Sequence, residues 1–273
     1  MKKLLTILSF LMMNRLWAGF HHPTPERNNI LYELSKAPTT SLNPNSIKVL
    51  VWNLHKGANS DFAKDLTALS EDKDILIFQE MLLDQKMTDI FLAMNGFGFE
   101  TATSFFYPPK MNRTGVATAS KSAPSETSYV RTEILEPAIK SPKVTLITRY
   151  PISGTDKFLT VANIHSINFV NSGNFKIELE RISEVLKKYP SPIIFAGDFN
   201  TWLNEKTQFL NIIRNKLNLK EAIFNPDQRL RFNKHPLDHF LYSSDLVIKT
   251  SKVDGFYTGS DHKPLEVELE YSP

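Results

Sequence analysis

The sequence contains no cysteine among its 273 residues, which excludes disulfide bonds and thiolate metal sites. It also lacks an apolar run long enough to cross a bilayer as a helix, because the most apolar stretch covers only Leu4 to Met13. Internal repeats and low-complexity tracts are absent as well. The remaining composition, 41% hydrophobic and 22% charged, is typical of a globular protein with a sizeable core.

A general excess of basic charge is also lacking. The formal net charge is +3, but Lys2, Lys3 and Arg15 lie in the first twenty residues, and without them acidic and basic residues balance. Overall charge therefore gives no argument for a nucleic-acid-binding protein, although a local basic patch remains compatible with it.

The N-terminus has the layout of a secretory signal peptide. A short basic start precedes the apolar stretch, and Ala18 offers a cleavage site. We expect a signal peptide over residues 1–18 and a secreted or periplasmic protein. Arg15 and the bulky residues before Ala18 leave an uncleaved anchor or a plain helix as alternatives. Residues 19–45 are rich in Pro, Thr, Asn and Ser, which predicts an irregular N-terminal arm, with one short helical turn at Ile30, Leu31 and Leu34.

Hydrophobic periodicity over residues 46–273 predicts one α/β domain. Short apolar runs predict strands, and apolar residues at a period of 3.6 predict helices. Several strands follow one another without room for a helix, so part of the sheet structure is antiparallel. The predicted strands are 47–52, 75–78, 97–107, 114–119, 143–149, 157–164, 193–196, 237–242 and 265–269, and the predicted helices are 61–69, 83–94, 174–189 and 205–216.

The stretch from Pro192 to Trp202 combines a buried strand with polar residues at its end. The apolar run at 193–196 is followed by Gly197, Asp198 and, one residue further, Asn200. Alternate side chains of a strand point the same way, so this acid and this amide would project into one space. An Asx turn that merely closes the strand is the alternative.

Other predicted strands show the same pattern of a polar residue beside an apolar run. These residues are Asn53, Glu80, His165, Asp238, Asp261 and His262. Strand ends gather on a shared rim of a sheet, where functional residues collect. Oxygen ligands suit Mg²⁺ or Mn²⁺ better than zinc, and histidines near acids suit proton transfer. The combination predicts hydrolysis of a phosphate ester.

The order of these motifs resembles that of a known superfamily. The motifs are Trp52-Asn53, Gln79-Glu80, Asn163-Ile164-His165, Gly197-Asp198-Phe199-Asn200, Leu237-Asp238-His239 and Ser260-Asp261-His262-Lys263-Pro264. They resemble the endonuclease/exonuclease/phosphatase superfamily, the DNase I-like metal-dependent phosphoesterases, over about Ile47 to Glu270. The resemblance implies a four-layer α/β sandwich, with two mixed β-sheets face to face and helices outside, and a catalytic domain at 46–273.

The resemblance also implies a metal site. Glu80 matches the main Mg²⁺ ligand, and Asn53 and Asp261 match residues close to the metal. Mn²⁺ is the alternative ion.

The same resemblance implies roles for five further residues. His262 matches the base that activates water, oriented by Asp238, although Asp198 is an alternative base. Asp198 and Asn200 match the pair that positions nucleophile and phosphate, and His165 matches a histidine that stabilises the transition state.

Two parts of the expected site are less defined. Glu100 and Glu133 are candidates for the acid that would hold His165 in place. Arg113, Arg149 and Arg231 are candidates for contacts with substrate phosphates, with solvated loop charges as the alternative.

The leading hypothesis is a monomeric, exported, Mg²⁺-dependent phosphodiesterase that acts as an endonuclease on DNA, with no obligate protein partner. The alternatives are a sphingomyelinase of phospholipase C type, with Phe105 to Tyr107 touching the membrane lipid, and a small-molecule phosphatase. A binding module without activity is disfavoured, because every matched position keeps a reactive residue type.

Overall fold

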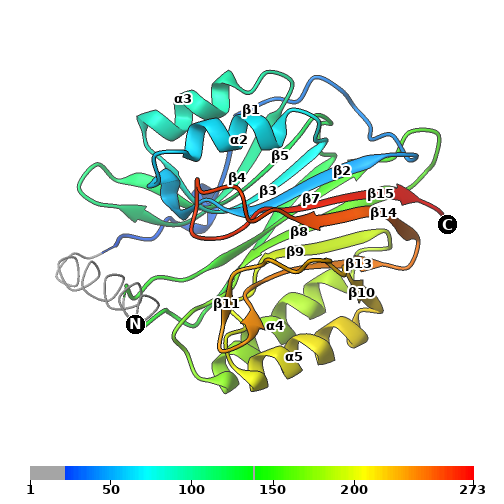
Figure 1. The fold of residues 1–273 in the computed structure, drawn as a ribbon. Helices are drawn as coiled ribbons and strands as arrows, with labels where there is room; N and C mark the ends of the chain where they lie inside the picture. The colour runs from blue at the N-terminus through cyan, green and yellow to red at the C-terminus, as the bar shows by residue number, and fades with distance from the viewer. Residues whose placement is uncertain (1–21, 138) are drawn as a thin grey trace.

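Two β-sheets lie face to face in the computed structural model, which describes residues 22–137 and 139–273 (Figure 1). The first sheet has the order β1-β4-β5-β3-β2-β15-β14 and the second the order β10-β13-β9-β8-β7-β6. Within these sheets β2 pairs with β3, and β8 with β9, in parallel, and the other neighbouring strands pair antiparallel. Both sheets are therefore mixed, as expected.

The strands of the first sheet are β1 (Leu31–Ser35), β2 (Ile47–Asn53), β3 (Ile75–Leu83), β4 (Gly98–Tyr107), β5 (Asn112–Ser120), β14 (Leu246–Val253) and β15 (Leu265–Tyr271). Those of the second are β6 (Glu126–Arg131), β7 (Val144–Pro151), β8 (Phe158–His165), β9 (Ile193–Asp198), β10 (Leu219–Glu221) and β13 (Asp238–Ser243). A two-stranded ribbon, β11 (Arg231–Phe232) and β12 (His235–Pro236), lies in the connection before β13.

Helices cover the outer face of each sheet (Figure 1). They are α2 (Phe62–Ser70) and α3 (Gln85–Ala93) on the first sheet, and α4 (Ser172–Leu186) and α5 (Asn204–Lys216) on the second, with short 3₁₀ turns η1 (Arg27–Asn29) and η2 (His55–Gly57). The α3 and α4 helices begin at side-chain caps, where Asp84 and Asn171 accept hydrogen bonds from the first turn. The result is the predicted four-layer α/β sandwich.

The core follows from strand alternation. One apolar face of each sheet meets the other sheet, as Val51, Ile77 and Ala196 do, while the opposite face meets the helices, as Phe78 and Phe195 do. Alternate residues of a strand point to opposite faces, so each central strand is apolar on both sides. This explains why these strands read as continuous apolar runs.

The prediction of an irregular N-terminal arm is wrong at residues 31–35. This segment is the strand β1, which pairs antiparallel with β4 at the edge of the first sheet, and it does not form the expected helical turn. Its five side chains are half-buried or exposed, so no hydrophobic period marks it. The predicted signal peptide at 1–18 lies outside the described residues. Among the described residues, no helix combines the length and hydrophobicity needed to span a membrane.

Candidate active site

The inward-facing rows of four central strands start with apolar residues and end with polar ones. They are Val49-Val51-Asn53 of β2, Val161-Asn163-His165 of β8, Ile194-Ala196-Asp198 of β9 and Tyr242-Phe240-Asp238 of β13. Because alternate residues share a face, the last member of each row lies at the rim of the space between the sheets. The structure therefore brings together polar residues that are far apart in the sequence.

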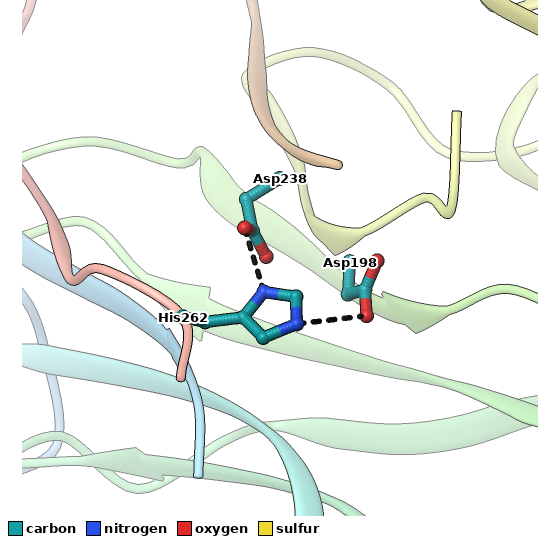
Figure 2. Close-up of side chains that lie close together, drawn as sticks. All are labelled: Asp198, Asp238 and His262. Carbon is teal, nitrogen blue, oxygen red and sulfur yellow. Dashed lines mark hydrogen bonds and ion pairs between the residues drawn. The ribbon is translucent and has the colours of Figure 1, made fainter. Parts of the chain in front are cut away.

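His262 forms a short hydrogen bond with Asp238, from Nδ1 to Oδ2 at 2.8 Å (Figure 2). The loop that carries His262 is fastened to the end of β2. Ser260 donates to the carbonyl oxygen of Asn53 at 2.6 Å, and the Trp52 indole donates to that of His262 at 3.0 Å. The motif before β15 and the motif at the end of β2 are thus one structural unit.

Asp198 lies at the centre of the site. Its carboxylate accepts hydrogen bonds from Asn53 Nδ2 at 3.0 Å and from the backbone N–H of Asn200 at 2.9 Å. His262 Nε2 faces its Oδ2 atom at a distance of 3.9 Å (Figure 2). His165 Nε2 lies 3.6 Å from the same atom. Two histidines and one amide from three strand ends or loops therefore face one buried carboxylate.

The backbone at the end of β9 is unusual. Gly197 has φ 139°, and a Cβ atom there would lie 2.1 Å from the carbonyl oxygen of Ile164 on the neighbouring strand. Asn200 adopts φ 52°, in the left-handed region. Its side chain donates to the carbonyl oxygen of Ser166 at 3.0 Å, which fixes the residue. Strained backbone of this kind is retained where the surroundings hold it, often at functional sites.

The carboxylates and His262 shift one another's protonation. Burial alone would lower the pKa of His262, but the neighbouring Asp238 and Asp198 carboxylates outweigh it and raise the pKa to about 10. Burial raises the pKa of Asp198 to about 7, although His262 opposes that rise. Proton exchange near neutral pH is thus favoured at Asp198, and His262 is favoured in its charged form.

His165 is favoured in its neutral form. Burial, reinforced by the Lys143 ammonium, lowers the pKa of His165 well below its usual value, although Glu80 opposes this. The acids near its Nε2 are Asp198 at 3.6 Å and Glu80 at 4.0 Å. The expectation that Glu100 or Glu133 holds this ring is wrong. Residue 100 lies in β4, opposite Glu33 of β1, and residue 133 forms an ion pair with Arg181.

Glu80 lies at an irregularity in β3, where the register with β5 shifts between Phe78 and Met81. It has φ 51°, and its carboxylate forms an ion pair with Lys56. Despite burial, Lys56 holds the pKa of Glu80 well below its usual range, and Glu80 raises the pKa of Lys56 in return. Sequence reasoning missed Lys56, for which the nearest signal is its position three residues after Asn53.

The residues present fit a hard divalent cation. Glu80, Asn53 and Asp261 supply oxygen donors, and the charges of Glu80 and Asp261 both raise the pKa of Lys56. Oxygen donors of this kind suit Mg²⁺, and the Glu80 carboxylate already forms an ion pair with the Lys56 ammonium. A second group, Asp198, Asp238 and His262, has potential ligand atoms within 4.8 Å of one another. The hydrogen bond within that group favours proton transfer over metal ligation.

Two buried amides connect the sheets behind the site. Gln79 Nε2 donates to Asn163 Oδ1 at 2.8 Å, and Asn163 donates to the carbonyl oxygens of Phe78 and Ala117 at 3.1 and 2.9 Å. Both amides belong to the sequence motifs. Their contacts show a supporting role, because they fix β8 against β3 and β5.

The three arginines proposed for substrate contacts are engaged elsewhere. Arg113 donates to Asn29 of the N-terminal arm and lies over the Tyr32 ring, and Arg231 pairs with Asp227. Arg149 pairs with Glu126 at 3.2 Å and lies opposite Thr160, at the end of β8 remote from His165. The structure thus does not bring Arg149 to the rim.

Comparison with known proteins gives a consistent result. Residues 50–262 match the model of the endonuclease/exonuclease/phosphatase family. A UPF0294 protein of Vibrio campbellii is 32% identical over 236 residues, which cover 86% of this chain and 81% of the relative. Among solved structures, an endonuclease/exonuclease/phosphatase from Bacteroides vulgatus has a TM-score of 0.68 at 14% identity, over 84% of this chain and all of the other. The human Nocturnin catalytic domain has a TM-score of 0.60 at 19% identity, over 85% and 96%. The solved structures share the fold.

Proposed function

This chain belongs to the endonuclease/exonuclease/phosphatase family, whose members hydrolyse phosphoester bonds, and we propose that it is an exported, Mg²⁺-dependent endonuclease acting on DNA. The observation that carries the proposal is the arrangement around Asp198. One buried carboxylate faces the Nε2 atoms of His262 and His165 at 3.9 and 3.6 Å, and Asp238 orients His262 from behind.

The spacing of these atoms suits the activation of water. A water that binds Asp198 Oδ2 and His262 Nε2 at about 2.8 Å each would span their 3.9 Å separation with a near-right angle. Asp198, with its pKa raised to about 7, is the better acceptor for the proton of that water. His262 stays charged through Asp238, and its positive charge stabilises the negative charge that develops on the attacking oxygen and the phosphoryl group.

His165 and Asn200 are further polar residues of the proposed active site around Asp198. His165 is neutral and supplies a hydrogen bond rather than a full charge to the phosphate. A cation held by Glu80 with Asn53 and Asp261 would supply neutralisation of the charge that develops at the leaving oxygen.

The choice of DNA over membrane lipid is supported by the contacts of the aromatic segment in β4. Phe105 is 5% exposed, and the Phe106 ring lies under the Arg113 guanidinium at 5.5 Å. These rings pack within the protein, so the segment does not offer a membrane-touching tip. Export is proposed from the N-terminal sequence, and we propose a monomer because the predicted active site is formed within one chain.

The test is hydrolysis by protein that begins at residue 19, assayed in parallel on plasmid DNA, RNA and sphingomyelin, with Mg²⁺ or with EDTA. We expect EDTA-sensitive nicking of the plasmid. Lipid cleavage without DNA cleavage would transfer the protein to the sphingomyelinase class. Undiminished nicking in EDTA would contradict the metal dependence.

A further inference from the structure

A cavity of about 660 Å³ lies between the N-terminal arm, β6 with the loop that follows it, and α4. Four cationic side chains from these three segments line it, namely Arg27, Arg131, Lys140 and Arg181. Glu133 is the acidic residue among the described lining residues. The charges of the chain balance outside its first twenty residues, so this excess of positive charge is local. We call this region the arm cavity.

The arm cavity lies at the catalytic end of the second sheet. Arg131 of β6 is paired with Val144 of β7, and the next residue of β7, Thr145, is paired with Ile164, which precedes His165. Two strand spacings therefore separate the cavity wall from His165, or roughly 10 Å, and a third leads to Asp198. Phosphates of a duplex strand advance about 3.4 Å each along the axis and lie further apart than this in space, so the distance corresponds to at most about three or four nucleotides.

The cavity wall and the catalytic rim share a rigid connection. The Glu136 carboxylate in the wall loop accepts a hydrogen bond from the backbone N–H of Asn168 at 2.7 Å and pairs with Lys143 at 3.3 Å. Asn168 follows His165 by three residues and accepts the Trp202 indole N–H at 2.9 Å. Glu136 also accepts, through its carbonyl oxygen, the N–H of Lys140 at 2.8 Å. The position of the cavity relative to the catalytic residues is thus fixed by hydrogen bonds.

The cations converge from separate segments because hydrogen bonds hold those segments together. Arg131 donates to the carbonyl oxygen of Pro25 at 2.9 Å, and the Tyr129 hydroxyl donates to that of Arg27 at 3.0 Å. Arg181 pairs with Glu133 at 2.9 Å, which consumes the acid and leaves the other cations in excess. Arg27, Lys140 and Arg181 are exposed to solvent. An open cationic cavity suits a charged polymer backbone better than a metabolite that must be enclosed.

We propose that the arm cavity binds a backbone phosphate of a nucleic-acid strand, at most about three or four nucleotides from the bond that is cleaved. This inference rests on the proposed nuclease function and names the part of the chain that holds the polymer. It replaces the three arginines expected from the sequence with cations of the arm, the wall loop and α4.

The first experiment measures binding without cleavage. A fluorescein-labelled 12-base-pair DNA is titrated with the protein in EDTA between 50 and 200 mM salt, and the affinity is followed by fluorescence anisotropy. Each phosphate contact contributes about 0.9 to the slope of log affinity against log salt, or about threefold over this salt range. Because the cavity is proposed to hold one phosphate, we expect the double variant R27Q/K140Q to lower the slope by about that amount, and R27Q and K140Q each to lower it by part of that amount.

Lys220 provides the matched control, because it is an exposed lysine on β10 at the opposite edge of the same sheet. K220Q should keep the slope of the unmodified protein. A double variant with an unchanged slope overturns the proposal. A double variant that keeps its DNA slope but loses affinity for vesicles of anionic phospholipid also overturns it, and identifies a lipid site instead.

The second experiment separates this inference from the proposed function. The ratio of kcat/KM on the 12-base-pair DNA to kcat/KM on bis(p-nitrophenyl) phosphate is measured with Mg²⁺. The small diester is too short to reach both sites, so the ratio should fall about tenfold in the double variant. An unchanged ratio overturns the arm cavity. If the unmodified protein hydrolyses neither substrate, the proposed function fails, and the anisotropy slopes still decide whether the cavity binds DNA.

Discussion

Two consecutive residues of β13, Asp238 and His239, each belong to a histidine–carboxylate pair, and the two pairs behave differently. Asp238 bonds to His262 at 2.8 Å, and the next residue, His239, bonds to Glu221 at 2.7 Å. Asp238, His262 and His239 are buried, whereas Glu221 is half-buried. Because neighbouring residues of a strand point to opposite faces, Asp238 faces the rim between the sheets and His239 faces the helical side, where its ring meets Phe199.

The second nitrogen of each ring distinguishes the pairs. His239 Nε2 lies 2.7 Å from the Thr201 hydroxyl and 3.2 Å from the carbonyl oxygen of Pro236, so the protein satisfies it. His262 Nε2 lies 3.9 Å from Asp198, beyond hydrogen-bonding distance, so no hydrogen bond to that carboxylate occupies it and it can bind a water or a phosphoryl oxygen. A buried histidine–acid pair is therefore catalytic only when its other nitrogen remains available for the substrate.

The His239–Glu221 pair helps to hold the Asp238–His262 pair in position, and we call it the bracing pair. Arg229 contacts Glu221 at 3.3 Å and donates to the carbonyl oxygen of Asp238 at 3.0 Å. His239 and Thr201 connect β13 to the segment just after Asn200. We infer that one pair performs the reaction and the other holds the strands that present it.

The largest expected effect on activity comes from replacing the histidine of each pair with alanine and comparing the two variants. H262A should lower kcat/KM on bis(p-nitrophenyl) phosphate by about 10³-fold, since the variant loses the charge beside Asp198, and D198A should abolish hydrolysis similarly. H239A should keep kcat within about threefold in folded protein and unfold more easily. Activity and thermal melting of the purified variants check this. Turnover at the normal rate in H262A or D198A would overturn the site.

The comparison also shows what the sequence reveals and what it hides. The polar ends of β2, β8 and β9 were predictable because an apolar run followed by an acid, amide or histidine is a local pattern. The roles of His239 and His262 were not separable in this way, since both stand beside an aspartate in the sequence. Only the face of the strand and the partner of the second nitrogen decide between them.

The predictability of the strands also depends on whether their signal is local in the sequence or arises from tertiary contacts. The pattern predicts the central strands, but it misses the four strands at the sheet edges, β1, β14, β10 and β6. Edge strands bury less apolar surface and are held largely by backbone pairing, so their sequences carry a weaker period. Lys56 was missed for a related reason, because its ion pair with Glu80 depends on the irregularity in β3.

A smaller effect should follow from neutralising the acid of the bracing pair. Although burial opposes it, His239 and Arg229 lower the pKa of Glu221 to about 2. A carboxylate with a folded pKa below its unfolded value stabilises the protein above pH 4.5 and loses that stabilisation as the pH falls towards 2. E221Q should therefore lower the free energy of unfolding by about 3 kcal/mol at pH 7.

The same reasoning predicts that the difference between E221Q and the unmodified protein narrows by at least about 1 kcal/mol when the pH is lowered to 3.5. Urea unfolding at the two pH values measures it. D227N is a useful comparison, because Asp227 pairs with Arg229, whereas the hydrogen-bond partners of His239 within the described residues are Glu221, Thr201 and Pro236. A difference for E221Q that is the same at both pH values would contradict the ionic contribution of the pair.

The smallest expected effect comes from removing the hydroxyl that satisfies His239. In T201V the methyl group replaces an Oγ1 atom that lies 2.7 Å from His239 Nε2 and donates to the carbonyl oxygen of Pro236 at 2.5 Å. Loss of these contacts should cost about 1 kcal/mol of unfolding free energy, because the Pro236 carbonyl still lies within reach of the ring. The kcat on bis(p-nitrophenyl) phosphate should change by less than about twofold, while T201S should restore the stability. If instead T201V lowers kcat tenfold and leaves the unfolding free energy unchanged, His239 acts on the reaction itself, and the distinction between a catalytic pair and a bracing pair would have to be abandoned.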